Sequence, residues 1–163
     1  MAVFVARGGR KPPHADFFWS GNMSESKVEM SEELAMEEVR RWAEMNDIEL
    51  EGGSDEVKAA FENGTKRIVR AIRRGLLELS ESGDFVYTVS ARSPDGFAGE
   101  KIVLAAPTGK AFMAIDSFKQ SEIFHRILAF ASAMTGKDVG WFGRLSHTDF
   151  SIISDIVGFF MAS

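Results

Sequence analysis

The sequence contains no cysteine, which excludes disulfide bonds, thiolate nucleophiles and cysteine-ligated metal sites together. It contains no apolar run of the roughly 18 residues that a membrane-spanning helix needs, so we expect no transmembrane segment and no membrane partner. The apolar stretch at residues 2–6 is too short for a signal peptide, and we expect none. These absences together favour a protein of the reducing cytoplasm.

Histidine is also scarce, and its placement predicts no metal site. His14, His125 and His147 show no metal-ligand spacing with one another or with acidic residues. Ser146, His147 and Asp149 have the chemistry of a catalytic triad, but triad groups normally come from separate parts of a fold. We therefore expect Ser146 and Asp149 to cap a helix, and we predict no catalytic residue, no metal and no cofactor.

The segment Ala106-Pro-Thr-Gly-Lys-Ala111 resembles a phosphate-binding loop only superficially. The phosphate-binding pattern requires a glycine five positions before the glycine of its Gly-Lys pair, and a serine or threonine hydroxyl directly after the lysine. Leu104 and Ala111 occupy those two positions, so both the loop glycine and the magnesium ligand are missing. We predict a structural role instead, in which Pro107 ends a strand and Thr108 caps the next helix.

What is present is the composition of an ordinary globular protein. The chain has 163 residues, 45% of them hydrophobic and 26% charged, which suits one domain with a real core. Its net charge of −5 is unevenly distributed. Residues 22–63 carry 13 acidic and 4 basic groups, and residues 66–74 then carry five basic groups and no acidic one. Such asymmetry can guide association electrostatically.

The N-terminal part divides into an arm and two helices. Residues 1–24 mix Gly, Pro and Arg with the aromatic cluster Phe17, Phe18 and Trp19, and predict an irregular arm. These aromatic residues either pack on their own domain or bind a partner. Residues 31–46 predict a helix capped by Ser31. Residues 54–74 predict an amphipathic helix that Ser54 caps and Gly75 ends.

The rest of the chain, within a single domain at residues 25–163, predicts strands and then helices. Strand-like runs at residues 76–79, 85–90 and 101–105 are separated by turn sequences, which predicts an antiparallel hairpin or three-stranded meander over residues 76–106. Helical segments are expected at 109–116, 121–134 and 146–161, with a short turn at Trp141-Phe142 before the last. The fold class is thus α+β, mainly helical.

The polar face of the second helix is strongly basic, and its residues are Lys66, Arg67, Arg70, Arg73 and Arg74. The sequence leaves three roles open for this face: a solvated or internally paired surface, an acidic protein partner, or nucleic acid. Interleaved aromatic residues and a nucleic-acid motif are both missing, so we regard nucleic acid as an unlikely partner.

The last helix carries more apolar residues than one face of a small domain requires. Its pattern indicates either a central core helix or an interface with a second copy or a hydrophobic client. On the second interpretation, the contacts would lie on Trp141, Phe142, Phe150, Ile153, Val157 and Phe160.

The order of these C-terminal elements resembles the tail assembly chaperones of long-tailed bacteriophages. In that family a strand runs into Leu-x-x-Pro-Thr and a helix, here residues 104–116. A helix with small residues ending near Thr-Gly follows, here residues 123–136, and Leu145, Asp149 and Phe150 open a final apolar helix. The resemblance covers roughly residues 102–161.

The resemblance implies a non-enzymatic protein of the infected host's cytoplasm. Such chaperones coat the long, helical tape-measure protein, assist tail-tube subunits to assemble around it, and are generally absent from the finished particle. Eight methionines and fourteen phenylalanines could supply an adaptable apolar surface, and the acidic segment could supply solubility. The alternative is a structural virion component, such as a connector or tail protein, anchored by Phe17, Phe18 and Trp19.

Overall fold

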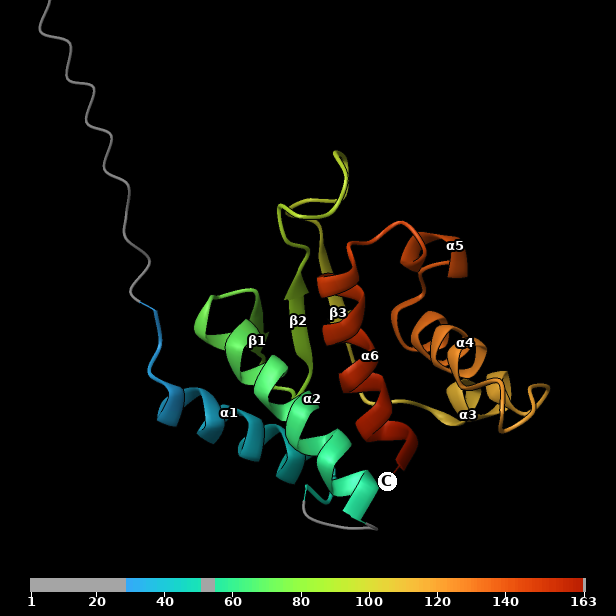
Figure 1. The fold of residues 1–163 in the computed structure, drawn as a ribbon, viewed down its shortest axis with the longest axis horizontal. Helices are drawn as coiled ribbons and strands as arrows, with labels where there is room; N and C mark the ends of the chain where they lie inside the picture. The colour runs from blue at the N-terminus through green and yellow to red at the C-terminus, as the bar shows by residue number, and fades with distance from the viewer. Residues whose placement is uncertain (1–28, 51–54, 163) are drawn as a thin grey trace, which may run out of the picture.

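A computed structural model describes residues 29–50 and 55–162 of the chain. Within those residues it contains six helices and one three-stranded antiparallel sheet, arranged as a single α+β domain (Figure 1). In chain order the elements are α1 (Glu32–Met45), α2 (Asp55–Arg73), β1 (Leu77–Leu79), β2 (Phe85–Thr88), β3 (Lys101–Leu104), α3 (Gly109–Ile115), α4 (Ile123–Thr135), α5 (Val139–Phe142) and α6 (His147–Ala162).

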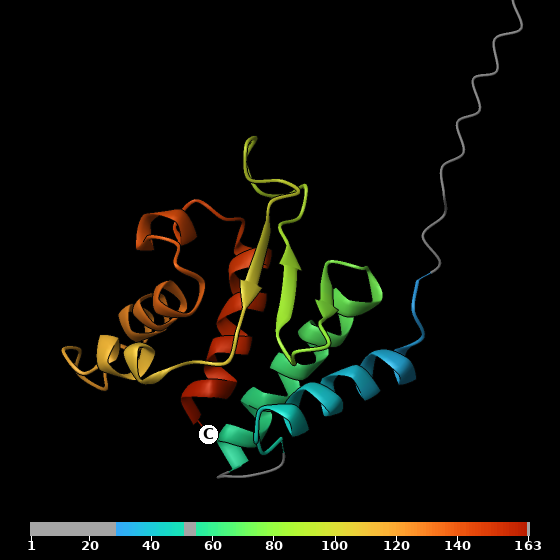
Figure 2. The ribbon, with the colours of Figure 1, turned by 180° about the vertical axis from the view of Figure 1, so that it is seen from behind.

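The sheet is a meander with the strand order β1-β2-β3, which decides between the two predicted forms in favour of three strands. Val86 pairs with Glu78 on one side and with Val103 on the other. Phe85 and Tyr87 are buried while Val86 and Thr88 are partly exposed, as the twofold alternation of a strand requires. The strands lie behind α2 and α6 in Figure 1 and in front of them in the reverse view (Figure 2).

Helix α6 is the central element of the domain. It packs against α2 on one side and α4 on the other, which explains why apolar residues surround most of its circumference (Figure 1). Seven of its residues are buried, namely Asp149, Ile152, Ile153, Ile156, Val157, Phe159 and Phe160. The core-helix interpretation of the sequence is therefore the one that describes α6.

An aromatic cluster around Trp42 joins three elements. The indole ring of Trp42, on α1, stacks on Phe85 of β2 with ring centroids 4.8 Å apart. The rings of Phe159 and Phe160, on α6, meet it edge-on at 5.9 and 5.4 Å. Offset stacking and edge-to-face contacts are the favourable geometries for aromatic pairs. This cluster fixes α1 and α6 against the same end of the sheet.

The ends of the helices largely follow the predicted signals. The hydroxyl of Ser31 accepts a hydrogen bond from the amide of Leu34 and caps α1. Gly75 follows α2 with φ of 65°, a conformation in which glycine carries no steric cost. One capping prediction is wrong: Thr108 occupies the N-cap position of α3, but its side chain makes no capping hydrogen bond. The predicted cap at Ser54 lies outside the described residues.

Candidate partner-binding surface

The structure buries most of the C-terminal residues that the sequence singles out as partner contacts. Five of these six residues are at most 6% exposed, namely Trp141, Phe142, Ile153, Val157 and Phe160. They pack inside the domain, which corrects the expectation of an interface there, because a partner cannot reach these side chains in this conformation. The sixth residue, Phe150, is half-buried and packs against the core. The remaining predicted contacts, Phe17, Phe18 and Trp19, lie outside the described residues.

Of the nine exposed large apolar side chains in the described residues, four belong instead to the helical hairpin formed by α3 and α4. Met113 is 73% exposed, Ile123 and Phe124 are each 54% exposed, and Phe112 is 43% exposed. We call these four residues the α3–α4 apolar surface. The hairpin lies on the side of α6 opposite to α1 and α2 (Figure 1). Large apolar side chains exposed on adjacent helices are typical of sites that bind other proteins.

Local packing explains why these side chains face outward. Ala111 and Ile115, four residues apart on α3, are the buried residues of that helix and turn its other sides to solvent. The exposed aromatic rings are nevertheless held in place. Phe112 meets buried Phe130 edge-on with ring centroids 5.1 Å apart, and Phe124 lies 5.5 Å from the ring of Phe150. The surface is therefore carried by rings with fixed neighbours.

Sequence reasoning missed this surface, although a signal for it was present. Three pairs of adjacent large apolar residues occur in these helices, namely Phe112-Met113, Ile123-Phe124 and Ile127-Leu128. Adjacent residues on a helix point about 100° apart, so a helix that buries a single narrow face cannot bury both members of a pair. The short length of α3 and its small buried residue Ala111 give it such a narrow face.

The buried carboxylate of Asp149 forms the main polar cluster of the domain. It accepts hydrogen bonds from the hydroxyls of Tyr87, Ser90, Ser93 and Ser146, and from the backbone amide of Ser90, over distances of 2.5–3.0 Å. Asp149 is 0% exposed. A buried carboxylate with this many donors is satisfied without a counter-ion.

The same hydrogen bonds control the ionisation of both groups. Burial would raise the pKa of Asp149, but the hydrogen bonds from Ser146, Ser93, Tyr87 and the Ser90 amide outweigh burial and lower it below its ordinary value. The pKa of Tyr87 is raised, first by burial and then by its hydrogen bond to the Asp149 carboxylate. The cluster therefore contains a carboxylate and a neutral phenol at neutral pH.

This cluster holds the start of α6 against the sheet rather than forming a triad. Ser146 accepts a hydrogen bond from the amide of Asp149 at 3.2 Å, which caps α6 as the sequence predicts. The Ser146 hydroxyl donates to the Asp149 carboxylate, whereas His147 is exposed at the first position of the helix. Within the described residues, no group of three potential metal ligands occurs either.

Two residues of the basic face are paired inside the molecule. Arg67 makes two hydrogen bonds to the carboxylate of Asp155 on α6, at 2.5 and 2.7 Å. The hydrogen bond to Asp155 raises the pKa of Arg67, and this effect exceeds the opposite effect of burial, which lowers the pKa. Arg73 lies 3.6 Å from Glu32 and 3.9 Å from Glu29, in the acidic segment. Internal pairing, one of the roles left open, thus applies to these two arginines.

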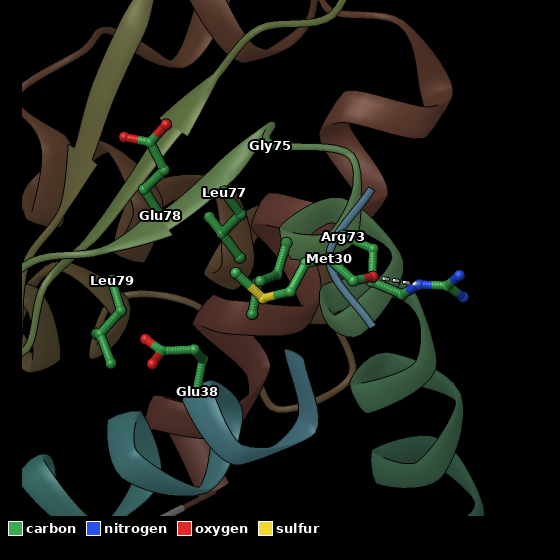
Figure 3. Close-up of a pocket in the computed structure, with 8 residues that line it drawn as sticks. Met30, Glu38, Arg73, Gly75, Leu77, Glu78 and Leu79 are labelled. Carbon is green, nitrogen blue, oxygen red and sulfur yellow. Dashed lines mark hydrogen bonds between the residues drawn. The ribbon is translucent and has the colours of Figure 1, made fainter. Parts of the chain in front are cut away.

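A cavity of about 390 Å³ lies between the start of α1, the end of α2 and the edge strand β1 (Figure 3). Its lining mixes apolar residues such as Met30 and Leu77 with Glu38 and Glu78. The guanidinium of Arg73 donates to the carbonyl oxygen of Met30 at 3.1 Å and extends away from Glu38 (Figure 3). Without a converging set of polar groups, this cavity offers no defined chemistry.

Comparisons with known proteins give no independent guide to function. No protein-family model matches the chain, no curated protein matches it, and no solved structure matches its fold. No helix in the described part of the chain is both long and apolar enough to cross a membrane. The exposed side chains of the α3–α4 apolar surface make it the candidate functional site.

Proposed function

We propose that the chain is a non-enzymatic tail assembly chaperone of a phage or prophage. In this role it binds the apolar face of a long helical tape-measure protein in the host cytoplasm, and keeps it soluble while tail-tube subunits assemble. The observation that carries the proposal is the α3–α4 apolar surface, in which four large side chains are between 43% and 73% exposed. A helical client with an apolar stripe offers a complementary surface.

Two further features support this proposal. The surface lies inside the stretch that resembles the chaperone family, since residues 112–124 fall within residues 102–161. The surface also suits a client with a varied sequence, because the flexible side chain of Met113, which is 73% exposed, can adapt to irregular apolar partners. The net charge of −5 helps to keep such an exposed surface soluble.

The proposal is tested by co-purification of a tagged chain with the tape-measure protein encoded in the same phage or prophage. The double variant Met113→Gln/Ile123→Gln removes exposed apolar side chains from α3 and α4. Val103→Gln/Val139→Gln is a matched control, because Val103 is 50% and Val139 is 46% exposed and both lie outside the hairpin. We expect the first variant to lose the client and the control to retain it.

Equal retention of the client by both variants would contradict this surface as the binding site. A second outcome would overturn the function itself: if the chain is present in purified virions in a fixed ratio to the tail subunits, it is a structural component. In that case the N-terminal residues Phe17, Phe18 and Trp19 become the expected anchor.

A further inference from the structure

Four arginines converge on a second cavity, on the opposite side of α6 from the α3–α4 apolar surface. The cavity has a volume of about 310 Å³ and lies between α2, the start of α6 and the loop after β2. Arg67, Arg70 and Arg74 come from α2, Arg92 comes from the loop, and His147 begins α6. Thr148 and Ser151 complete the polar lining, and the Ser151 hydroxyl donates a hydrogen bond to the backbone carbonyl oxygen of His147.

The spacing of the α2 arginines produces this convergence. Residues 67, 70 and 74 lie three and seven positions apart, so their side chains leave the helix on one face. They span about 10 Å along the helix axis, at a rise of roughly 1.5 Å per residue. Arg92 is contributed by a segment distant in sequence, and donates to the hydroxyl of Thr148 at 3.3 Å. The cavity is thus assembled by the tertiary fold.

The charge in this cavity is not neutralised by its own lining. No carboxylate is among the residues that line it. Asp155 pairs with Arg67 from the side of α6 and fixes the position of that guanidinium. Within the part of the chain that the structure describes, no carboxylate lies within ion-pair distance of Arg70, Arg74 or Arg92. Among the described residues, these three guanidinium groups therefore have no ionic partner and can face an anion.

Arginine, hydroxyl and histidine donors are the groups that recognise phosphate oxygens. The planar guanidinium can donate two parallel hydrogen bonds to a phosphate, which a lysine ammonium cannot do. All four cations of this cavity are arginines. We propose that this cavity binds a compact phosphate-bearing ligand that carries a di- or triphosphate group.

A compact ligand fits better than a long nucleic acid or an acidic peptide. The chain carries a net charge of −5 and an acidic segment over residues 22–63, which would repel a long polyanion beyond the cavity. No phenylalanine, tyrosine or tryptophan lines the cavity, so it lacks the large aromatic rings on which the bases of single strands commonly stack. An acidic peptide distributes its charges along an extended chain, whereas a diphosphate concentrates them within a volume of this size.

The test is calorimetric titration of the full-length chain with pyrophosphate and with tripolyphosphate at low salt. The variant Arg70→Gln/Arg74→Gln removes two exposed guanidinium groups that make no ion pair within the described residues. The control Arg40→Gln/Lys101→Gln removes the same charge from exposed positions outside the cavity. We expect binding to weaken by about tenfold or more in the first variant and to remain unchanged in the control.

Three results would overturn the proposal. Absence of pyrophosphate and tripolyphosphate binding by the unaltered chain is one, and equal weakening in both double variants is another, because the effect would then follow net charge alone. The third is preferential binding of a polymer. Competition by poly-glutamate would assign the cavity to an acidic protein. Tighter binding of a single-stranded oligonucleotide, with steep salt dependence, would assign it to nucleic acid. A nucleoside triphosphate compared with free tripolyphosphate distinguishes the two sources of the phosphate group.

Discussion

Tyr87 donates a hydrogen bond of 2.5 Å to Asp149, although 62 positions separate the two residues in the sequence. The phenol comes from the middle of β2 and the carboxylate from the first turn of α6. This contact and the serine hydroxyls around it join the sheet to the central helix. The cluster is therefore a site where single substitutions report on the fold.

Replacing Asp149 by Asn should destabilise the domain by about 2–4 kcal/mol. The change preserves shape, but the amide nitrogen cannot accept the hydrogen bonds that the carboxylate receives from Ser93 and Ser146. Urea unfolding followed by far-ultraviolet circular dichroism measures the loss. The control Asp95→Asn, at an exposed loop position, should leave the free energy of unfolding within about 0.5 kcal/mol of the original.

The stability of the domain should also depend on Asp149 at acid pH. The pKa of this carboxyl is lower in the folded chain than the unfolded value of about 3.9. Its contribution is therefore complete above the unfolded pKa and is lost as the pH falls through the folded pKa. Urea unfolding from pH 7 to pH 2 should show the difference between the original chain and Asp149→Asn shrinking at low pH. A constant difference would contradict the lowered pKa.

Tyr87 is the only tyrosine in the chain, so its ionisation can be followed directly by ultraviolet absorbance. Burial, followed by the neighbouring carboxylate, raises its pKa. The folded protein should show no tyrosinate near pH 10, where the phenol of the urea-unfolded chain is half ionised. Above that pH the unfolded state releases a proton that the folded state retains, so stability should fall. If the Tyr87 phenol of the folded protein ionises near pH 10, the phenol is exposed to solvent and the raised pKa is contradicted.

The ion pair between Arg67 and Asp155 should couple α2 to α6 measurably. The geometry is bidentate and Asp155 is largely buried, but the Arg67 side chain is 45% exposed and solvent screens the interaction. A double-mutant cycle with Arg67→Gln and Asp155→Asn should give a coupling energy of about 1 kcal/mol. The coupling should decrease in high salt. A coupling of zero at low salt would show that the pair does not hold the helices.

The sequence predicts the elements of this fold well because each one depends on local signals. The period of α1 and its Ser31 cap, and the alternation of buried and exposed residues in β2, are encoded by neighbouring residues. The Asp149 cluster is different. Only the capping bond from Ser146 is local, whereas Tyr87, Ser90 and Ser93 approach through the tertiary fold. No spacing in the sequence brings those three residues to Asp149.

The candidate site was harder to predict for a related reason. The sequence pattern of the aromatic residues in α5 and α6 is compatible with a buried core and with an exposed interface, because composition does not reveal how many elements pack against a helix. The packing of α6 between α2 and α4 determines that these residues belong to the core, and Ile153 and Val157 are completely buried. The hairpin of α3 and α4 lies at the edge of the domain, so residues such as Met113 and Phe124 remain exposed.

The chaperone role is tested most directly by the soluble fraction of the tape-measure protein during co-expression. We predict that this protein is mainly insoluble alone and mainly soluble when the chain is present. We also predict that Met113→Gln/Ile123→Gln abolishes the effect while Val103→Gln/Val139→Gln preserves it. If the chain leaves the solubility of the tape-measure protein unchanged, the proposed function is contradicted.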